Sequence, residues 1–329
     1  MNRQDHFQSL ISISGENDFE ALALKVFQYQ AANNKVYGDF IMRLGIKTES
    51  IKVVKDIPFL PAEIFKSHEV ITGENKIEKI FTSSGTTRLQ PARHFIKDLE
   101  FYDKVSGHIF TKMFGSLGDF MILALMPSPK ERPDSSLIHM VNSFIQKSSV
   151  DGSGFCLDKD EELLSQLTSA HKSGKKTLLF GLTYALLDFS EKHPMDFPNL
   201  MVMETGGMKG QRREMVREEV HEKISVKFGV RSVCSEYGMS ELLSQAYSKG
   251  EGRFRSPAWM KILIRDTYDP LEYVALNKTG GINIIDLANI DSCAFLATQD
   301  LGKLHEDGTF EVLGRFDEAD VRGCNLMVL

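Results

Sequence analysis

The stretch Phe81-Thr82-Ser83-Ser84-Gly85-Thr86-Thr87 follows a short run, Lys79-Ile80-Phe81, that is typical of the end of a β-strand. Beyond that run the chain offers hydroxyl and backbone N–H groups around one glycine, Gly85. Such a loop can surround the oxygens of a polyphosphate, because glycine allows the backbone to approach closely. The glycine–lysine–serine/threonine ending of the common nucleotide-hydrolase loop is absent, so a polar surface turn is the alternative interpretation.

Short apolar runs alternate with longer amphipathic segments after this loop. The apolar runs cover residues 120–126, 177–180, 200–203 and 230–234, and candidate helices cover 97–114, 136–147, 161–173, 184–192 and 212–228. This alternation is typical of a parallel sheet with helices on its faces. Shorter strand-like runs follow at 261–265, 281–286, 293–298 and 310–313, and Asp307-Gly308 signals a hairpin. We expect an α/β fold with parallel-rich sheet layers, flanking helices and a small β-rich subdomain.

Composition narrows the classes of partner. The 329 residues include 39 Lys and Arg against 45 Asp and Glu, giving a net charge of −6. This balance argues against nucleic acid as the main partner, because phosphate backbones require clustered cations. The first residues lack the apolar core of a secretory signal, and the run 120–126 is too short to cross a bilayer. The four cysteines show no zinc or disulfide spacing, so we expect a cytoplasmic protein with no membrane span.

Two candidate ligand loops follow the predicted parallel strands, whose carboxyl ends meet at one edge of a sheet. In Glu204-Thr205-Gly206-Gly207 the glycines would admit a planar base or an extended acyl chain, although a flexible connection explains them equally well. In Ser235-Glu236-Tyr237-Gly238-Met239-Ser240-Glu241, Tyr237 offers a stacking face for a purine and Ser240 a donor to a phosphate oxygen. Glu241, expected at the surface, is a hard ligand for magnesium. Ordinary packing and solvation are the alternatives for these residues.

Two further candidates lie in the β-rich region. Asp300 ends the predicted strand at Thr298-Gln299-Asp300 and can accept hydrogen bonds from both hydroxyls of a ribose. Arg315, in Gly314-Arg315-Phe316-Asp317, supplies a cation suited to ribose or phosphate. The alternatives are a strand-end cap for Asp300 and a surface ion pair between Arg315 and Asp317.

The order of these motifs resembles the adenylate-forming superfamily of acyl-CoA synthetases and related ligases, over residues 50–329. Within it the chain is most similar to the acyl-protein synthetase (LuxE) family of bacterial bioluminescence. Supporting stretches are Ile57-Pro58-Phe59-Leu60-Pro61, Glu204-Thr205-Gly206-Gly207 and the tail from Asp320 to Met327. The resemblance implies the N-terminal-domain fold of these enzymes, with their large mobile C-terminal domain and its catalytic lysine absent.

The resemblance also implies a reaction, in which a carboxylate attacks the α-phosphate of ATP with Mg²⁺ and pyrophosphate leaves. It assigns the β- and γ-phosphates to Ser83, Ser84, Gly85, Thr86 and Thr87. It assigns adenine and acyl contacts to Gly206 and Gly207, adenine to Tyr237, the α-phosphate to Ser240, Mg²⁺ to Glu241, and the ribose to Asp300 with Arg315 nearby. Gly238 is a further expected ATP-binding residue. Arg88 stands where the family has a small residue; it either adds a phosphate contact, which we favour, or obstructs the loop.

One cysteine is a candidate nucleophile. In the acyl-protein synthetases a cysteine near the C-terminus accepts the acyl group as a thioester, and Cys324 matches that position. Arg322 nearby would lower the pKa of the Cys324 thiol, whereas an inert packed thiol is the alternative. Cys156, Cys234 and Cys293 lie in apolar runs and are expected in the core.

The residues together with the resemblance predict an ATP-dependent ligase that forms the acyl-adenylate of a fatty or aromatic acid and transfers the acyl group to a thiol, through Cys324 or directly to a partner. The resemblance implies a reductase or a carrier protein as that partner. The acid is inferred from the Met, Leu and Phe content of residues 120–144. A ligase that loads coenzyme A or a carrier protein without a cysteine step, and a degenerate nucleotide-binding homologue, remain alternatives. The expected parts are a helical segment (1–75), a nucleotide- and acyl-binding core (76–250), a β-rich subdomain (251–313) and a tail with Cys324 (314–329).

Overall fold

The computed structural model describes residues 3–74, 76–83, 90–208, 211–213 and 215–316. The chain divides into two compact units, one of Met1–Phe7 with Glu74–Pro257 and one of Gln8–Gly73 with Ala258–Leu329. The N-terminal helices thus share a unit with the late strands, whereas the sequence-based division placed residues 1–75 and 251–313 in separate parts. The helix α1 (Arg3–Ile11) opens the chain.

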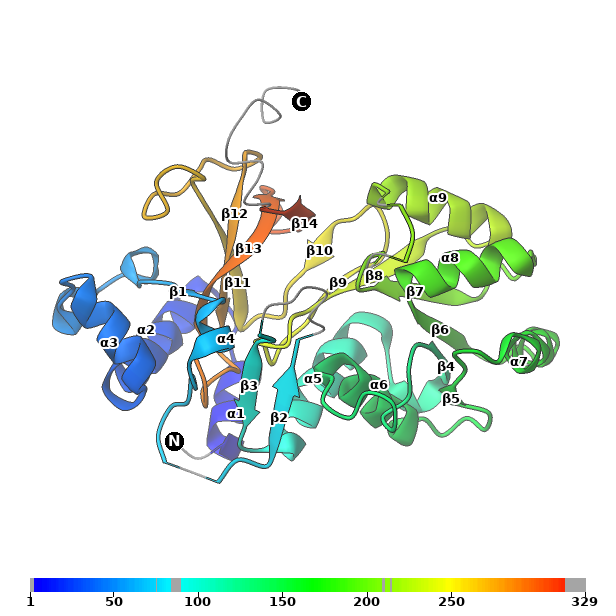
Figure 1. Cartoon of the computed structure of the whole chain (residues 1–329), viewed down its shortest axis with the longest axis horizontal. Coiled ribbons are helices and arrows are strands. Elements are labelled where there is room, and N and C mark those ends of the chain that lie inside the picture. The colour runs from blue at the N-terminus through cyan, green and yellow to red at the C-terminus, as the bar shows by residue number, and fades with distance from the viewer. Residues whose placement is uncertain (1–2, 75, 84–89, 209–210, 214, 317–329) are drawn as a thin grey trace. The chain divides into compact units, whose positions relative to one another are not determined.

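The first unit is built on a parallel sheet with strand order β8-β7-β6-β4-β5 (Figure 1). Its strands are β4 (Met121–Leu125), β5 (Gly154–Phe155), β6 (Thr177–Leu182), β7 (Met201–Thr205) and β8 (Val233–Tyr237). The short strands β9 (Ala246–Ser248) and β10 (Phe254–Arg255) continue it in antiparallel sense. Every residue of β4 and β6 is buried, which is typical of strands covered by helices on both faces.

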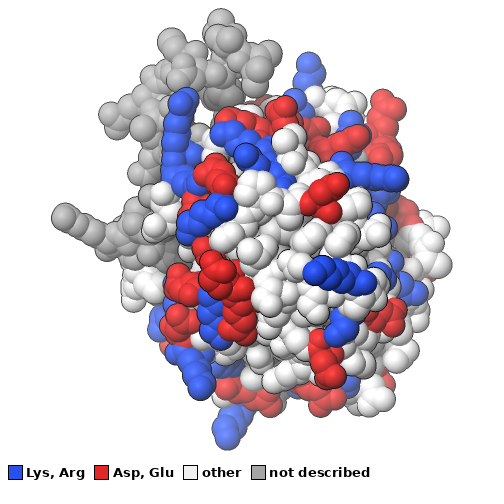
Figure 2. All heavy atoms as spheres, turned by 90° about the vertical axis from the view of Figure 1, so that its right-hand side faces the viewer, with Lys and Arg blue, Asp and Glu red and all other residues white. Residues whose placement is uncertain are grey.

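The helices of this unit alternate with its parallel strands. They are α5 (Leu99–Phe114), η3 (Leu117–Asp119), α6 (Ser136–Lys147), α7 (Asp160–Ser173), α8 (Thr183–Lys192) and α9 (Arg217–Phe228). A separate antiparallel hairpin of β2 (Lys79–Thr82) and β3 (Arg93–Ile96) precedes them. On the face that looks toward the viewer in Figure 2, basic and acidic side chains are interspersed and form no broad field of one sign.

The second unit combines helices with an antiparallel sheet in the order β11-β12-β13-β14. Its strands are β1 (Leu60–Pro61), β11 (Met260–Arg265), β12 (Thr279–Asp286), β13 (Phe295–Leu304) and β14 (Phe310–Arg315), and its helices are α2 (Glu16–Asn33), α3 (Lys35–Arg43), η1 (Thr48–Ser50), η2 (Val54–Asp56) and α4 (Ile64–Ser67). The buried amide of Gln30 ties α2 to the β12–β13 connection: Nε2 donates to the carbonyl of Asn289 at 2.9 Å, and Oε1 accepts from the N–H of Ala294 at 2.9 Å.

The α/β fold class and the main run of strands and helices are confirmed. The Asp307-Gly308 hairpin is also confirmed, because Gly308 has φ 77° in the turn that joins β13 to β14. Two boundaries were wrong. The helix expected from residue 212 begins at Arg217, and β13 continues to Leu304, so Asp300 lies inside a strand. None of the helices in the described parts of the chain is both long and apolar enough to span a bilayer.

Candidate active site

The parallel strands β4, β6, β7 and β8 end at one edge of the sheet in the first unit. Because the strands run in the same direction, the segments after Leu125, Leu182, Thr205 and Tyr237 emerge together. The Gly206-Gly207 segment and the Gly238–Glu241 segment are two of these. The topology therefore gathers at one edge two motifs that the sequence places some thirty residues apart.

The β2–β3 hairpin is tied to the same edge by two described contacts. The backbone N–H of Thr82 donates to the carbonyl of Asp134 at 2.8 Å, and the Thr82 hydroxyl donates to the Asp134 carboxylate. Nδ1 of His94 lies 2.7 Å from the carbonyl oxygen of Ser240. A carbonyl can only accept, so Nδ1 carries a proton. The strands that flank the predicted phosphate loop thus lie beside the Ser240–Glu241 segment.

Ser83 closes the base of the predicted phosphate loop. Its backbone N–H donates to the carbonyl of Ala92 at 3.1 Å, and its hydroxyl oxygen accepts from the Ala92 N–H at 2.9 Å. A serine hydroxyl that accepts one hydrogen bond still has its own proton to donate. Ser83 can therefore close the loop and contact a phosphate. The other predicted members, Ser84, Gly85, Thr86, Thr87 and Arg88, lie outside the described residues.

Gly206 and Gly207 form an exposed turn directly after β7. Their φ angles are 80° and 63°, in the left-handed region that side chains with a Cβ avoid. A Cβ added to Gly207 would meet no heavy atom within 4 Å. The two glycines thus make a defined turn with open space beside its backbone, where a planar group could lie.

Tyr237 is the last residue of β8 and is 9% exposed. Its ring meets that of Phe254 at a centroid distance of 5.9 Å and an angle of 61°. Gly238 is exposed, and a Cβ there would lie 2.5 Å from Oε1 of Glu236, so a larger residue would require that carboxylate to move. The expectation that Glu241 is a surface carboxylate was wrong: it is 7% exposed, and its Oε2 accepts from the Ser240 hydroxyl at 2.8 Å.

Glu204 lies in a buried cluster of polar side chains that the sequence did not predict. Its Oε2 accepts from the Thr183 hydroxyl at 2.7 Å, and its Oε1 lies 3.4 Å from Nε of Arg217 and 3.5 Å from Nε2 of His221. Burial alone would raise the pKa of Glu204, but the His221 hydrogen bond and the Arg217 charge outweigh it and lower the pKa to about 2. An acid at the end of an apolar strand was the only sequence signal for this cluster.

A second carboxylate contact joins the ends of β7 and β8, on the face of the sheet opposite to Glu204. Successive side chains of a strand point to opposite faces, so Thr205 lies on the face away from Glu204. There its hydroxyl donates to Oε2 of Glu236 at 2.5 Å. The ends of β7 and β8, which carry the two candidate loops, are therefore joined by side chains on both faces.

Ser235, His221 and Glu204 do not form a nucleophilic triad. The Ser235 hydroxyl lies 3.2 Å from Nε2 of His221, the same nitrogen that contacts Glu204. A triad needs the acid on the other ring nitrogen, to orient the base toward the nucleophile. Ser235 is also fully buried. The cluster is an anchor rather than a hydrolytic centre.

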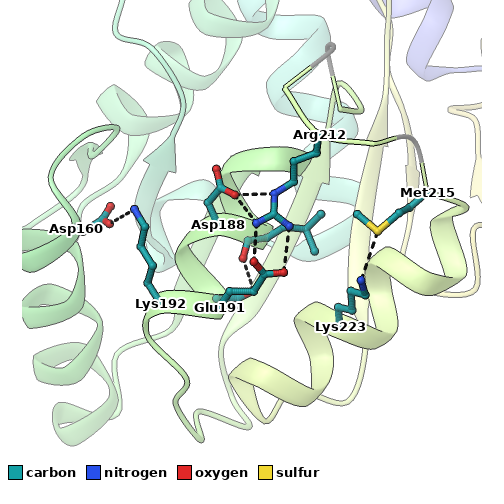
Figure 3. Close-up of polar contacts among 9 residues, drawn as sticks. Asp160, Asp188, Glu191, Lys192, Arg212, Met215 and Lys223 are labelled. Carbon is teal, nitrogen blue, oxygen red and sulfur yellow. Dashed lines mark hydrogen bonds and ion pairs between the residues drawn. The ribbon is translucent and has the colours of Figure 1, made fainter.

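Arg212, which lies between Gly207 and α9 in the sequence, is held on α8 (Figure 3). Nε of Arg212 donates to Oδ1 of Asp188 at 2.6 Å, and the two terminal nitrogens of Arg212 donate to the carboxylate oxygens of Glu191 at 3.0 and 2.6 Å. Arg212, expected in the first turn of a helix, instead lies before α9, which begins at Arg217. Figure 3 shows the Arg212 side chain directed toward Asp188 and Glu191 of α8.

Asp300 and Arg315 lie directly opposite each other on β13 and β14 in the second unit. Nε of Arg315 is 3.4 Å from Oδ1 of Asp300, and a terminal nitrogen of Arg315 donates to Oε1 of Gln299 at 3.3 Å. The Arg315 side chain is 66% exposed and that of Asp300 14%. In the structure the ion-pair partner of Arg315 is therefore Asp300, whereas Asp317 lies outside the described residues.

The three described cysteines are in the core, as predicted. Burial raises the pKa of the Cys156 and Cys234 thiols to about 11 and that of Cys293 to about 12, so none of them is a thiolate at neutral pH. Cys324 lies outside the described residues. No group of three or more His, Cys, Asp and Glu side chains is positioned to hold a metal ion in the described part of the chain.

Comparison with known proteins gives one sequence relative and many structural ones. No family model matches the chain. The long-chain-fatty-acid–luciferin-component ligase of Vibrio harveyi is 25% identical over 334 residues, which cover 91% of this chain and 84% of that protein.

The solved structures share the fold. ATP-bound MatB from Rhodopseudomonas palustris gives a TM-score of 0.55 at 16% identity over 74% of this chain and 49% of MatB, so the match spans about half the length of MatB. A 2-hydroxyisobutyryl-CoA ligase in its postadenylation state gives 0.67 at 13% identity over 92% of this chain and 68% of that one.

Proposed function

From the resemblance of this chain to the adenylate-forming superfamily, and within it to the acyl-protein synthetases, we propose that it is an ATP-dependent ligase. It activates a carboxylic acid as an acyl-adenylate and passes the acyl group to a thiol. The observation that carries the proposal is the 2.7 Å contact between His94 and Ser240, which brings the stem of the phosphate loop to the Ser240–Glu241 segment. Two motifs that the resemblance assigns to one triphosphate thus share one sheet edge.

The described residues fit the parts of ATP and its metal ion. The open backbone at Gly207 suits a planar base or an acyl chain, and the Ser83 hydroxyl, which accepts from Ala92 and keeps its own proton, suits a phosphate oxygen. The Ser240 hydroxyl donates to Glu241 and would donate to the α-phosphate instead when Glu241 holds the metal ion. Glu241 would hold Mg²⁺, which commonly takes one or two carboxylates and completes its shell with substrate phosphates and water. The ion would neutralise negative charge on the phosphates. In the second unit, Asp300 would bind the ribose hydroxyls, with Arg315 beside it.

In the first step, a carboxylate oxygen of the acid bonds to the α-phosphorus. The bond from that phosphorus to the oxygen that bridges to the β-phosphate breaks, and pyrophosphate leaves with the electron pair. Negative charge shifts toward the leaving group as this bond breaks. Donors fixed before the reaction stabilise that charge without reorganising, and the Ser83 hydroxyl, held in place by the N–H of Ala92, would be one of them.

In the second step, the Cys324 thiolate attacks the acyl carbon, AMP leaves, and a thioester forms. Two observations support this step, one for the acyl group and one for the cysteine. The curated relative is named as a ligase of long-chain fatty acids to a luciferin component, and the thiols of Cys156, Cys234 and Cys293 are buried with raised pKa values. A fatty acid is accordingly the proposed substrate, and a partner protein the proposed final acceptor.

Exchange of labelled pyrophosphate into ATP tests the first step. The chain is assayed with saturated acids from two to sixteen carbons and with an aromatic acid, with and without Mg²⁺. We expect Mg²⁺-dependent exchange that is strongest with the long-chain acids. Measurable ATP binding without exchange for any acid would overturn the proposal and favour a nucleotide-binding homologue without turnover.

Direct loading of coenzyme A is the second candidate, because a neighbour in fold is a CoA ligase solved with an acyl-adenylate and CoA. Cys324→Ala separates the two. We expect this variant to keep pyrophosphate exchange and to lose hydroxylamine-sensitive acyl labelling, with Cys156→Ala as the control that keeps both. If Cys324→Ala still delivers acyl groups to an acceptor at the normal rate, the cysteine step is wrong.

A further inference from the structure

Glu204 joins the two ends of the segment that carries the Gly206-Gly207 turn. It lies two residues before Gly206, and its Oε1 is 3.4 Å from Nε of Arg217, the first residue of α9. The segment thus leaves β7 and enters α9 at a single ion pair. Ser83 and Ala92 close the base of the phosphate loop in a comparable way.

Arg217 also contacts Phe254, and through that ring the ion pair is linked to Tyr237. The guanidinium carbon of Arg217 lies 4.9 Å from the centroid of the Phe254 ring, within the range of a cation–π contact. The Phe254 ring in turn meets Tyr237 at 5.9 Å. A continuous series of contacts, Glu204 to Arg217 to Phe254 to Tyr237, therefore links the glycine turn to the aromatic residue expected to stack on adenine.

We propose that Glu204 and Arg217 are positioning residues, which hold the Gly206-Gly207 turn and the Tyr237 ring in the relative placement that substrate binding requires. The inference rests on the proposed function of this edge. Neither residue touches the reacting atoms; both act through the backbone of the turn and through Phe254.

This buried ion pair fixes geometry in addition to any stability that it contributes. The desolvation cost of a buried ion pair offsets much of its attraction, and well-packed apolar residues often stabilise a core equally well. The pair does fix geometry, because the carboxylate also accepts from Thr183 and contacts His221. Four elements, β7, α8, α9 and β10, therefore keep one arrangement around it.

Steady-state kinetics separate the two roles. In Glu204→Gln and Arg217→Gln we expect the apparent KM values for ATP and acid to rise at least ~10-fold, because the turn and the Tyr237 ring lose their relative placement. The change in kcat should be smaller. A tenfold change corresponds to ~1.4 kcal/mol of binding free energy. The control is Ile224→Ala, which removes a fully buried side chain of the same helix. A variant that only loses folded molecules has a lower apparent kcat and an unchanged KM. Unchanged KM in both Gln variants would overturn the inference.

The double variant tests whether the two residues act as one unit. Residues in one network couple, so the Glu204→Gln/Arg217→Gln enzyme should have KM values within about threefold of the worse single variant. Multiplication of the two single effects would show that the residues act independently, and the proposed linkage would then be wrong.

Hydrogen exchange keeps the inference testable if the wild-type chain activates no acid. In that case the proposed function fails, and the positioning role is judged from backbone amides alone. We expect the amides of residues 205–208 to exchange at least ~10-fold faster in Glu204→Gln, as local opening there becomes easier. In Ile224→Ala the increase should be confined to α9. Equal protection of 205–208 in Glu204→Gln and wild type would reject the anchor.

Discussion

The strand ends of the first unit and the β13–β14 ladder of the second hold their candidate residues in different ways. At the strand ends the residues lie on loops, and buried polar side chains such as His94 and Glu204 fix those loops by contacts between different helices and strands. In the ladder, Asp300 and Arg315 are register partners, and strand pairing alone brings them to 3.4 Å.

This difference between loop and ladder predicts whether a substitution changes activity, stability or both. A loop residue depends on anchors that also stabilise the fold, so its replacement should alter both activity and stability. A ladder residue with an exposed side chain is placed by backbone hydrogen bonds that survive the substitution, so its replacement should alter activity alone.

Glu241→Gln should give the largest effect. Loss of the metal ligand removes several kcal/mol of charge stabilisation, so we expect pyrophosphate exchange to fall at least ~1000-fold. Because Glu241 is buried and accepts from Ser240, the free energy of unfolding should also fall by about 1–3 kcal/mol, measured by urea denaturation. Glu131→Gln, at an exposed carboxylate, is the control. Unchanged Mg²⁺-dependent exchange in Glu241→Gln would count against the metal assignment.

Glu204 should make stability depend on acid pH. Its pKa is lowered from 4.5 to about 2 in the folded chain, so its stabilisation is present above pH 4.5 and is lost as the pH falls toward 2. At neutral pH the lowered pKa contributes about 3 kcal/mol to the free energy of unfolding, and about 2 kcal/mol of this contribution is lost by pH 3. Unfolding free energies of wild type and Glu204→Gln at pH 6 and pH 3 measure it. An identical pH dependence in both proteins would contradict the shift.

Asp300→Asn should affect ATP use and spare stability. Loss of a charged hydrogen-bond acceptor costs roughly 1.5–3 kcal/mol in binding, so the KM for ATP should rise about 10–150-fold. The variant should also discriminate less between ATP and 2′-deoxy-ATP. Arg315→Gln, at an exposed side chain, should change the unfolding free energy by no more than about 0.5 kcal/mol. Undiminished discrimination in Asp300→Asn would remove this residue from the ribose site.

Alanine substitutions at Gly207 and Gly308 should give the smallest effects and compare one glycine turn in each unit. Gly207 and Gly308 have φ 63° and 77°, and a Cβ on either would meet no heavy atom within 4 Å. Alanine should therefore cost about 1 kcal/mol of stability at each, through backbone strain alone. Only Gly207→Ala should raise the KM for ATP or acid, because only there would the methyl group enter ligand space. Equal KM values in the two variants would show that no ligand approaches Gly207.

Features that depend on neighbouring residues were predicted from the sequence, whereas features that depend on distant residues were not. The helix at Ser136–Lys147 matches its predicted bounds because its apolar spacing and its Ser135 cap are local signals. The burial of Glu241 and the contacts of Arg212 were missed, because each depends on residues distant in the sequence. Arg212, for example, is held by Asp188 and Glu191 on α8.

The sequence by itself determined the α/β alternation, the motifs at strand ends and the hairpin turn at Asp307-Gly308, since periodicity and turn sterics act over a few residues. Only the tertiary structure decided that His94 reaches Ser240 and that Glu204 joins β7 to α9. Such contacts depend on which strands become neighbours, and strand order is a property of the whole sheet rather than of any single segment.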